Sequence, residues 1–437
     1  MADDRKRQFL YFAVMAGLLA ATGWIHSWNV SLSILNLCLI SAVMAIGVNI
    51  QWGFAGLFNV GIMGFAALGG LAAMLVSVAP VPEAWAAGGR GVVAAGAVAA
   101  ATILLAFAVG RHLPRSRTRT LAIPGILIVG FLLARWVFGP ATDAIEKINP
   151  ASTGFLGGAG LPIILSWAVG GAFAGAAAWF IGKLALGLRS DYLAIATLGI
   201  SEIIVAILKS EDWLSRGVKN VAGLPRPVPY EIDLVKTDWI TGLAERFGTD
   251  GVTLSAIIVK LNYALLFAAV LAVIVWLSER ALNSPWGRMM RAIRDNEVAA
   301  NAMGKDVTGR HLEVFVLGSV VVGVAGAMLT TLDGQLTPAS YQPLRFTFLI
   351  WVMVIVGGSG NNWGSVLGGF LVWFLWIESE PAGHLLMNLV TSGMGEGNAL
   401  RSHLLASAAH MRTLTMGVLL IVVLRFFPRG LIPERQR

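Results

Sequence analysis

The chain has 437 residues, of which 57% are hydrophobic and 13% are charged, and its mean hydropathy is +0.75. Soluble proteins carry about 25% charged residues, so this composition excludes a soluble globular fold and indicates an integral membrane protein. The net charge of +8 is interpreted as membrane topology and not as nucleic-acid affinity, because no soluble domain is present to carry a basic face. The single cysteine, Cys38, excludes a disulfide framework.

Apolar runs predict an all-α, polytopic transmembrane helix bundle with 10–12 membrane segments over residues 1–437. The first run follows basic residues as a signal peptide would, but its length and the lack of a clear cleavage site favour a retained span. The tenth and eleventh runs are short for full spans and are interpreted as a broken or re-entrant unit. The predicted segments are 9–25, 32–50, 55–78, 91–110, 121–138, 162–183, 191–208, 254–278, 312–332, 346–358, 364–377 and 404–425.

Basic residues gather in four places: before the first segment, after the fourth, between the eighth and ninth, and at the C-terminus. A twelve-segment alternating topology puts all four groups on one side, which is then the cytoplasm. Both termini are accordingly expected in the cytoplasm, and the loop 209–252 is expected outside, as a cover for the outer mouth or as a plain connector. The groups are Arg5, Lys6, Arg7; Arg111, Arg115, Arg117, Arg119; Arg280, Arg288, Arg291, Arg294, Lys305, Arg310; and Arg425, Arg429, Arg435, Arg437.

Two apolar stretches, Asn49–Asn59 and Gly357–Gly364, are interrupted by Gly and Asn residues. Helices interrupted in this way often mark a transport site near the bilayer middle. Ordinary turns and close helix packing would give the same pattern. The candidate translocation residues in these stretches are Asn49, Gly53, Gly56, Asn59, Gly357, Gly358 and Asn361.

Glu202 lies near the centre of the predicted segment 191–208. An acidic side chain there costs about 2.5–3.5 kcal/mol on insertion scales, so such residues usually face a cavity or a partner. Glu202 is therefore a further pathway candidate that contacts the amino group of a substrate, or else a buried structural hydrogen-bonding residue.

Residues 284–304, within the loop 279–311, predict a short amphipathic helix that is too polar to span a membrane. Ser284 is the expected N-cap with Pro285 at the first helical position, and Gly304 is the expected stop. A helix of this kind lies on the membrane surface, connects two spans, or docks into a soluble partner.

The order of residues in this helix favours docking. Glu297, Ala299, Ala300 and Gly304 match the E-A-A-x-x-x-G pattern of the cytoplasmic loop in permeases of ATP-binding cassette (ABC) importers. Within that family the chain resembles the permeases of branched-chain amino acid transporters, specifically the LivM-type subunit. The resemblance is carried by Leu188–Ile203, Arg291–Ala300, Gly357–Gly360 with Trp363-Gly364, and Phe427–Leu431.

The resemblance implies alternating access driven by ATP on other chains, since this chain has no G-x-x-x-x-G-K-[ST] motif and is expected to hold no cofactor. It also implies a bacterial inner-membrane complex with membrane lipid, a second, LivH-type permease, two cytoplasmic ATP-binding subunits and a periplasmic substrate-binding protein. The residues expected to couple this chain to the ATPase are Arg291, Arg294, Asp295, Asn296, Glu297, Ala299, Ala300 and Gly304.

The chain departs from the family pattern in two places. Residues 80–160 look like an insertion with two extra apolar segments, and residues 215–223 replace a T-G-G-x-x-G-I stretch in the outer loop. The second departure leaves a urea or short-amide importer open as an alternative substrate class. A secondary transporter or channel would leave the E-A-A-like loop unexplained, and a membrane-embedded enzyme would need clustered His, Asp or Glu residues.

Overall fold

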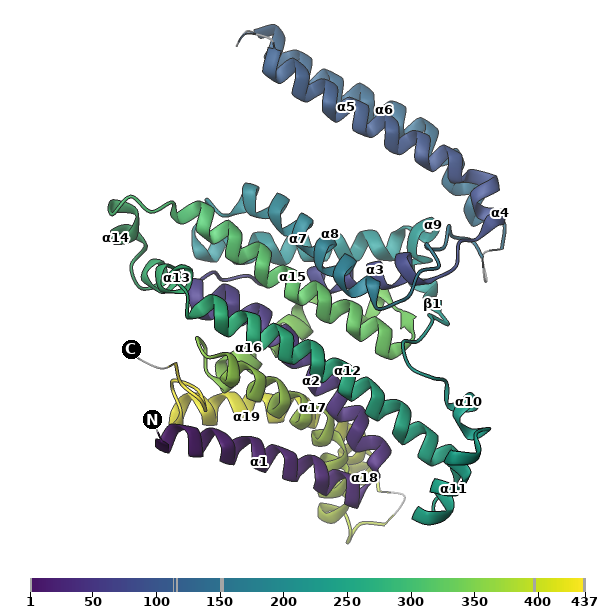
Figure 1. The fold of residues 1–437 in the computed structure, drawn as a ribbon, viewed down its shortest axis with the longest axis vertical. Helices are drawn as coiled ribbons and strands as arrows, with labels where there is room; N and C mark the ends of the chain where they lie inside the picture. Colours follow the sequence, from purple (N-terminus) through teal and green to yellow (C-terminus); the bar gives the residue numbers. More distant parts are fainter. Residues whose placement is uncertain (1, 113, 115–116, 150–152, 396–397, 435–437) are drawn as a thin grey trace.

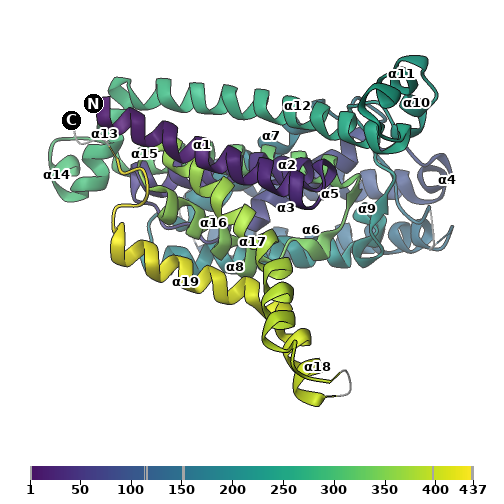
Figure 2. The same cartoon turned by 90° about the horizontal axis from the view of Figure 1, so that it is seen from below.

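The computed structural model describes residues 2–112, 114, 117–149, 153–395 and 398–434, with the backbone alone for residues 2–5. It is an all-α bundle, and each of the twelve predicted segments contains a helix (Figures 1 and 2). The first helices are α1 (Ala2–Ile25), α2 (Trp28–Val48), α3 (Ile62–Ser77), α4 (Pro82–Ala84), α5 (Arg90–His112), α6 (Arg117–Glu146), α7 (Leu165–Ala185), α8 (Ser190–Ser210), α9 (Asp212–Ser215) and α10 (Glu231–Val235). They are followed by α11 (Asp238–Phe247), α12 (Gly251–Leu282), α13 (Pro285–Asp295), α14 (Glu297–Ala302), α15 (Val307–Asp333), α16 (Pro343–Gly357), α17 (Asn362–Val390), α18 (Ala399–Ala406) and α19 (Met411–Phe426).

Within the described residues, nine segments are long and apolar enough to cross a bilayer. Two further apolar helices, α3 and α16, are shorter, and both are largely buried among the other helices. A spanning helix needs about 20 residues, so α3 and α16 cross only part of the bilayer. The chain is therefore a multi-pass membrane protein with a core of partial helices surrounded by full spans.

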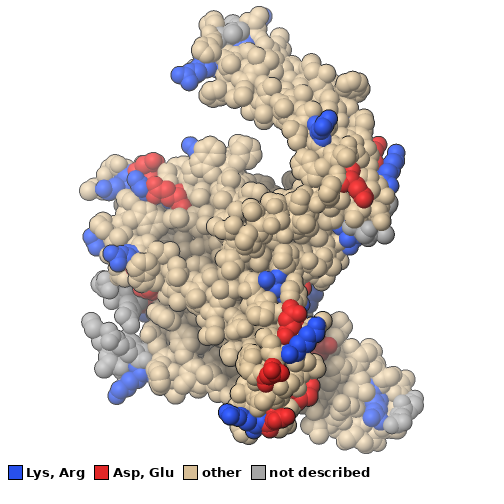
Figure 3. Space-filling view, turned by 45° about the vertical axis from the view of Figure 1, so that its right-hand side comes forward, with Lys and Arg blue, Asp and Glu red and all other residues tan. Residues whose placement is uncertain are grey.

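Both termini lie at the same end of the bundle as α13 and α14, here called the termini end (Figure 2). The Arg7 guanidinium donates to the Leu431 carbonyl oxygen at 2.7 Å and ties the N-terminal helix to the C-terminal segment. In the space-filling view, charged side chains gather toward the two ends and an uncharged band lies between them (Figure 3). Of the basic residues that set the predicted topology, Arg115, Arg435 and Arg437 lie outside the described residues, as does the side chain of Arg5.

The opposite end, here called the sheet end, carries α9, α10, α11 and a two-stranded sheet (Figure 1). Strand β1 (Val221–Ala222) pairs antiparallel with β2 (Gln335–Leu336), so that Val221 is opposite Leu336. The loop 209–252 is thereby joined to the chain that leaves α15, and the Leu224 amide adds a hydrogen bond to the Gly334 carbonyl oxygen at 3.0 Å.

Helices α3, α7 and α15 pack through glycines. A Cβ atom at Gly69 would lie 1.9 Å from the Gly323 carbonyl oxygen, and one at Gly326 would lie 2.0 Å from the Ala66 carbonyl oxygen. A Cβ atom at Gly323 would lie 2.5 Å from the Gly170 carbonyl oxygen. Small residues of this kind let helix backbones approach closely in a membrane, where lipid gives little hydrophobic drive for association.

Helices α5 and α6 form a hairpin that projects from the sheet end and leans away from the bundle (Figures 1 and 3). Its base is fixed by a small cluster that includes Ala84, Ile145 and Leu156, and by the ring of Phe138 against Trp213 at 5.3 Å. Most of the remaining hairpin surface is apolar and exposed, as at Phe107, which is 66% exposed. This geometry is compatible with the prediction that residues 80–160 are an insertion, which stays a prediction.

Two predicted segment boundaries were wrong. Residues 55–61, placed at the start of a span, are mostly irregular, because a π-turn at Asn49–Gly53 ends α2 and α3 begins only at Ile62. The segment 364–377 is part of the 29-residue helix α17, so the eleventh segment is not short. Apolar composition alone shows neither where a helix breaks nor how far it continues.

Candidate functional site

The loop between α12 and α15 contains two helices, α13 and α14, that project beyond the termini end (Figure 1). The prediction of one continuous helix over 284–304 was wrong, because the backbone at Asn296 is extended and its side chain caps α14 by accepting from the Ala299 amide at 2.9 Å. Pro285 opens α13, and Gly304 ends α14 at a positive φ of 77°. The expected N-cap hydrogen bond at Ser284 is absent, since its hydroxyl donates instead to the Ala281 carbonyl oxygen at 2.6 Å.

The two helices differ in burial. In α13, Met290 and Ile293 are buried in the main core. In α14, Ala300 is buried, whereas Val298 and Met303, the residue that directly follows α14, are each 80% exposed. The apolar side chains of this loop are thus divided, since those of α13 face the bundle and those at α14 are mostly exposed.

Arg294 fastens α13 to the end of α2. Its Nη1 donates to the Gly53 carbonyl oxygen at 2.5 Å and to Glu434 Oε2 at 2.8 Å, and its Nε donates to Asp295 Oδ1 at 3.1 Å. Burial alone would lower the pKa of Arg294, but its hydrogen bonds and charge pairs with Glu434 and Asp295 outweigh burial and raise the pKa. Arg294 is therefore a fixed cation that links α13, the π-turn of α2 and the C-terminal segment.

The π-turn of α2 is hydrogen-bonded to the turn between α16 and α17. Asn49 is buried, and its Oδ1 accepts from the Gly360 amide at 2.9 Å while its Nδ2 donates to Asn362 Oδ1 at 3.1 Å. Gly358, at φ 120°, gives the chain the backbone shape that closes this turn beside Ile432. The two interrupted stretches singled out in the sequence therefore meet at one place, here called the junction (residues 49–61 and 357–364).

The junction reaches from α13 to the middle of α15. Gln51 Nε2 donates to the Phe315 carbonyl oxygen at 2.8 Å and to Ser319 Oγ at 3.1 Å, and Gln51 Oε1 accepts from Asn59 Nδ2 at 2.8 Å. The Asn59 carbonyl oxygen accepts from Trp351 Nε1 at 3.1 Å. These bonds satisfy the polar groups that the broken helix exposes inside the membrane, where each unpaired group would cost several kcal/mol.

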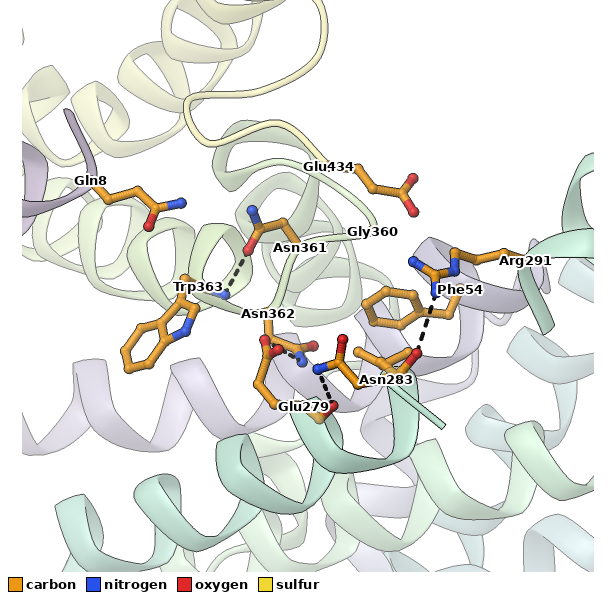
Figure 4. A pocket seen from close by; sticks show the side chains of 11 residues that line it. Gln8, Phe54, Glu279, Asn283, Arg291, Gly360, Asn361, Asn362, Trp363 and Glu434 are labelled. Atoms are coloured by element: carbon orange, nitrogen blue, oxygen red, sulfur yellow. Dashed lines mark hydrogen bonds between the residues drawn. The ribbon is translucent and has the colours of Figure 1, made fainter. Parts of the chain in front are cut away.

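A polar pocket of about 400 Å³ opens beside the junction at the termini end (Figure 4). It lies between Glu279 of α12, Arg291 of α13, the α16–α17 turn and Glu434. Asn362 Nδ2 donates to Glu279 Oε1 at 3.1 Å across one wall. Polar side chains from α12, α13 and α17 therefore line one water-accessible pocket.

Of the predicted pathway residues, all but one lie in the junction. Glu202 is on the exposed face of α8, next to Ser201, which packs against Gly64 on the opposite side. Its neighbours on that face are Ile195 and Ile203, which are 68% and 58% exposed. The structure thus excludes burial of Glu202 within this chain, and its role in a pathway stays a prediction.

The sequence prediction missed four polar residues: Gln51 and Asn362 of the junction, and Glu279 and Glu434 of the adjoining pocket. Gln51 and Asn362 lie inside the two interrupted stretches, so a search for amides in apolar runs would have found them. Within the described residues, no three His, Cys, Asp or Glu side chains are placed to hold a metal ion.

The sequence profile of the family described as branched-chain amino acid transport system / permease component matches residues 120–424. The LivM high-affinity branched-chain amino acid permease of Escherichia coli K12 is 27% identical over 47% of this chain and 48% of its own length. A probable LivM permease of Methanocaldococcus jannaschii is 24% identical over 57% of this chain and 61% of its own, and the E. coli K12 LivH permease is 25% identical over 41% and 51%.

The chain spans about half the length of the curated relatives it matches. No solved structure matches the chain significantly. Since the family profile covers well over half of the sequence and agrees with the multi-pass helical fold, the chain belongs to the branched-chain amino acid transport system permease family and is of the LivM type.

Proposed function

We propose that this chain is one permease subunit of an ABC importer for branched-chain amino acids, driven by ATP hydrolysis on separate cytoplasmic subunits. The observation that carries the proposal is α14, a short helix outside the bundle, where Val298 and the C-cap residue Met303 are each 80% exposed. Together with the E-A-A-like order of residues, these exposed apolar side chains give the loop beyond the spans a surface for a soluble partner.

The orientation follows from the same feature. If α14 binds a cytoplasmic ATPase, the termini end is cytoplasmic and so are both termini, as the basic residues predict. The sheet end, with the loop 209–252, then faces the periplasm and is the surface for a substrate-binding protein.

The contacts of α13 support a route for coupling. Force on α14 reaches α13 across the Asn296 break, then Gly53 through Arg294, and then the α16–α17 turn through Asn49. Moving a two-state equilibrium from 1:99 to 99:1 takes about 5.5 kcal/mol of differential interaction. A path from α14 to a broken span, made of two hydrogen-bonded steps and short chain segments, gives ATP binding a physical means of biasing which side is open.

The exposed position of Glu202 on α8 supports a contact between this face and a second permease. An acidic side chain facing lipid in the middle of a span costs about 2.5–3.5 kcal/mol. Gly199 lies on the same face, where a Cβ atom would meet nothing within 4 Å. We assign this face of α8 to the contact with the second, LivH-type permease, where Glu202 lies against a hydrogen-bond donor or a water-filled pathway.

The test is reconstitution of the chain with a second permease, the ATP-binding subunit and the binding protein in vesicles, with ATP-driven uptake of leucine, urea and acetamide measured side by side. The variant Val298→Asp puts a charge on the exposed face of α14 and is expected to abolish copurification with the ATPase. The matched control is Val218→Asp, at a valine that is 64% exposed in the loop 209–252, and it should leave ATPase binding intact.

Leucine uptake that requires ATP and fails in Val298→Asp supports the proposal. Uptake that continues without any ATPase subunit indicates a secondary transporter instead. Uptake of urea or acetamide in place of leucine would support an ABC importer but reject branched-chain amino acids as its substrate.

A further inference from the structure

An apolar cavity of about 230 Å³ lies between α2, α15, α16 and α17, on the sheet-end side of the junction. Its walls are aliphatic and aromatic, with Ile40 and Met44 from α2, Met63 from α3, and Ile350 and Met353 from α16. Methionine side chains adapt their shape to a ligand better than branched side chains do. The volume is below the roughly 300–1,000 Å³ of pockets for drug-sized ligands, so a smaller metabolite is the matching size.

Four polar groups interrupt this apolar lining: Ser41, Asp333, Ser340 and Trp373. Trp373 Nε1 is buried and has no hydrogen-bond acceptor among the described residues. The Ser41 hydroxyl, on a residue 5% exposed, forms no hydrogen bond with any described residue. Buried donors are almost always paired in native proteins, so groups left unpaired around a cavity need an explanation.

Asp333 gives the cavity a negative mouth. It is the last residue of α15, is exposed, and forms no ion pair within the described part of the chain. The carbonyl end of α15 adds negative potential at the same place. Arg345, near the start of α16, lies over the rings of Phe346 and Trp376 and does not pair with Asp333.

We propose that this cavity binds the transported amino acid: Asp333 takes the α-ammonium group, Trp373 Nε1 and the Ser41 hydroxyl take the α-carboxylate, and the methionine-rich wall takes an aliphatic side chain. The inference rests on the proposed function and adds to it a site inside a single permease. A sugar would leave several hydroxyls facing apolar walls, and urea would leave most of the cavity empty, so the chemistry selects a small apolar amino acid.

The position of the mouth fits entry from the periplasm. Asp333 is followed directly by β2, which pairs with β1 of the loop 209–252. An amino acid released at the sheet end would meet Asp333 before it reached the apolar wall. The outer loop therefore lies where it can influence loading of the cavity.

The experiment uses the full-length chain in lipid nanodiscs, without a binding protein, and detects ligand by saturation-transfer NMR. Three probes dissect the site: leucine, isoamylamine (which lacks the carboxylate) and isocaproate (which lacks the ammonium). Asp333→Asn should weaken the binding of leucine and isoamylamine about tenfold or more, because it removes an ionic hydrogen bond to the ammonium group. Trp373→Phe should weaken the binding of leucine and isocaproate severalfold and leave the binding of isoamylamine unchanged.

Two controls match these substitutions in chemistry and location. Asp238→Asn and Trp239→Phe lie at exposed positions of α11 at the sheet end and should bind all three probes as the unchanged chain does. Met353→Trp fills the cavity and should abolish binding of every probe. Circular dichroism and size-exclusion profiles equal to those of the unchanged chain show that the variants are folded.

Absence of leucine binding, or leucine binding that is unaffected by Asp333→Asn and Trp373→Phe, overturns the inference. The complete importer separates this result from failure of the proposed function. If complexes with Asp333→Asn and Trp373→Phe take up leucine normally with ATP, the importer proposal stands and the proposed binding site in the cavity is rejected. No ATP-driven leucine uptake by the unchanged, fully assembled complex rejects the importer itself.

Discussion

Arg294 is the residue through which the structure predicts that ATP hydrolysis reaches the membrane helices. Replacing it with glutamine removes the ion pair to Glu434 and the bond to the Gly53 carbonyl oxygen, which are 2.8 and 2.5 Å long. Hydrogen bonds to a charged group contribute about 1.5–3 kcal/mol, and partial exposure reduces this. Since the Arg294 side chain is 24% exposed and Glu434 is 26% exposed, we expect a loss of about 1–2 kcal/mol.

A loss of that size changes an equilibrium by about 5- to 30-fold. In reconstituted vesicles, Arg294→Gln should therefore hydrolyse ATP at a near-normal rate but import at least about fivefold less leucine per ATP. Leucine uptake and phosphate release are measured in the same vesicles, so that the ratio does not depend on the amount of protein.

Arg288→Gln is the matched control, because Arg288 lies on the same helix, is exposed, and its side chain forms no hydrogen bond or ion pair with the described residues. Arg288→Gln should keep the normal ratio of leucine to ATP. An unchanged ratio in Arg294→Gln, or an equal fall in both variants, would refute the reasoning that α13 acts through Arg294.

Three further predictions concern Gly326, Glu202 and Asn49, and the first has a control variant at Gly417. Gly326→Ala should destabilise the purified chain by about 1–3 kcal/mol in a thermal-shift assay, because its Cβ would lie 2.0 Å from a backbone oxygen of α3. Gly417→Ala, at a position with no atom within 4 Å, should be neutral or slightly stabilising. Glu202→Leu should leave the isolated chain folded but reduce copurification with the second permease, and unchanged assembly would show that this face of α8 contacts lipid. Asn49→Ala should lower the melting temperature, because it leaves the Gly360 amide buried and unpaired, and an unchanged melting temperature would contradict this.

The sequence predicts helix content well where an apolar run is long and uninterrupted. Every predicted segment contains a helix, since about 20 apolar residues have no other stable form in a bilayer. The breaks are harder to predict. Phe54–Phe58 is as apolar as the span before it, yet the chain leaves the helix at Gly56, where Gln51 bonds to Asn59 and to α15.

In the candidate site, too, the sequence predicts features that have a local signal and misses those that depend on contacts between distant residues. The E-A-A-like residues and both Gly/Asn stretches have local signals, and the sequence could single them out. Arg294 and Glu434 are 140 residues apart, and nothing near either residue indicates that they pair. Glu202 stands out as an acidic residue in a span, but whether it is buried or exposed depends on how α8 packs against α3, which sequence spacing does not determine.

The central claim is that α14 binds a cytoplasmic ATPase, and a single introduced cysteine tests it. In a Cys38→Ser background, Val298→Cys places a thiol where the side chain is 80% exposed, and inside-out membrane vesicles present it to a membrane-impermeant maleimide. We predict labelling in vesicles stripped of peripheral proteins and protection once the ATP-binding subunit is added back. Labelling only from the periplasmic side, or labelling that the ATP-binding subunit does not reduce, would contradict the claim.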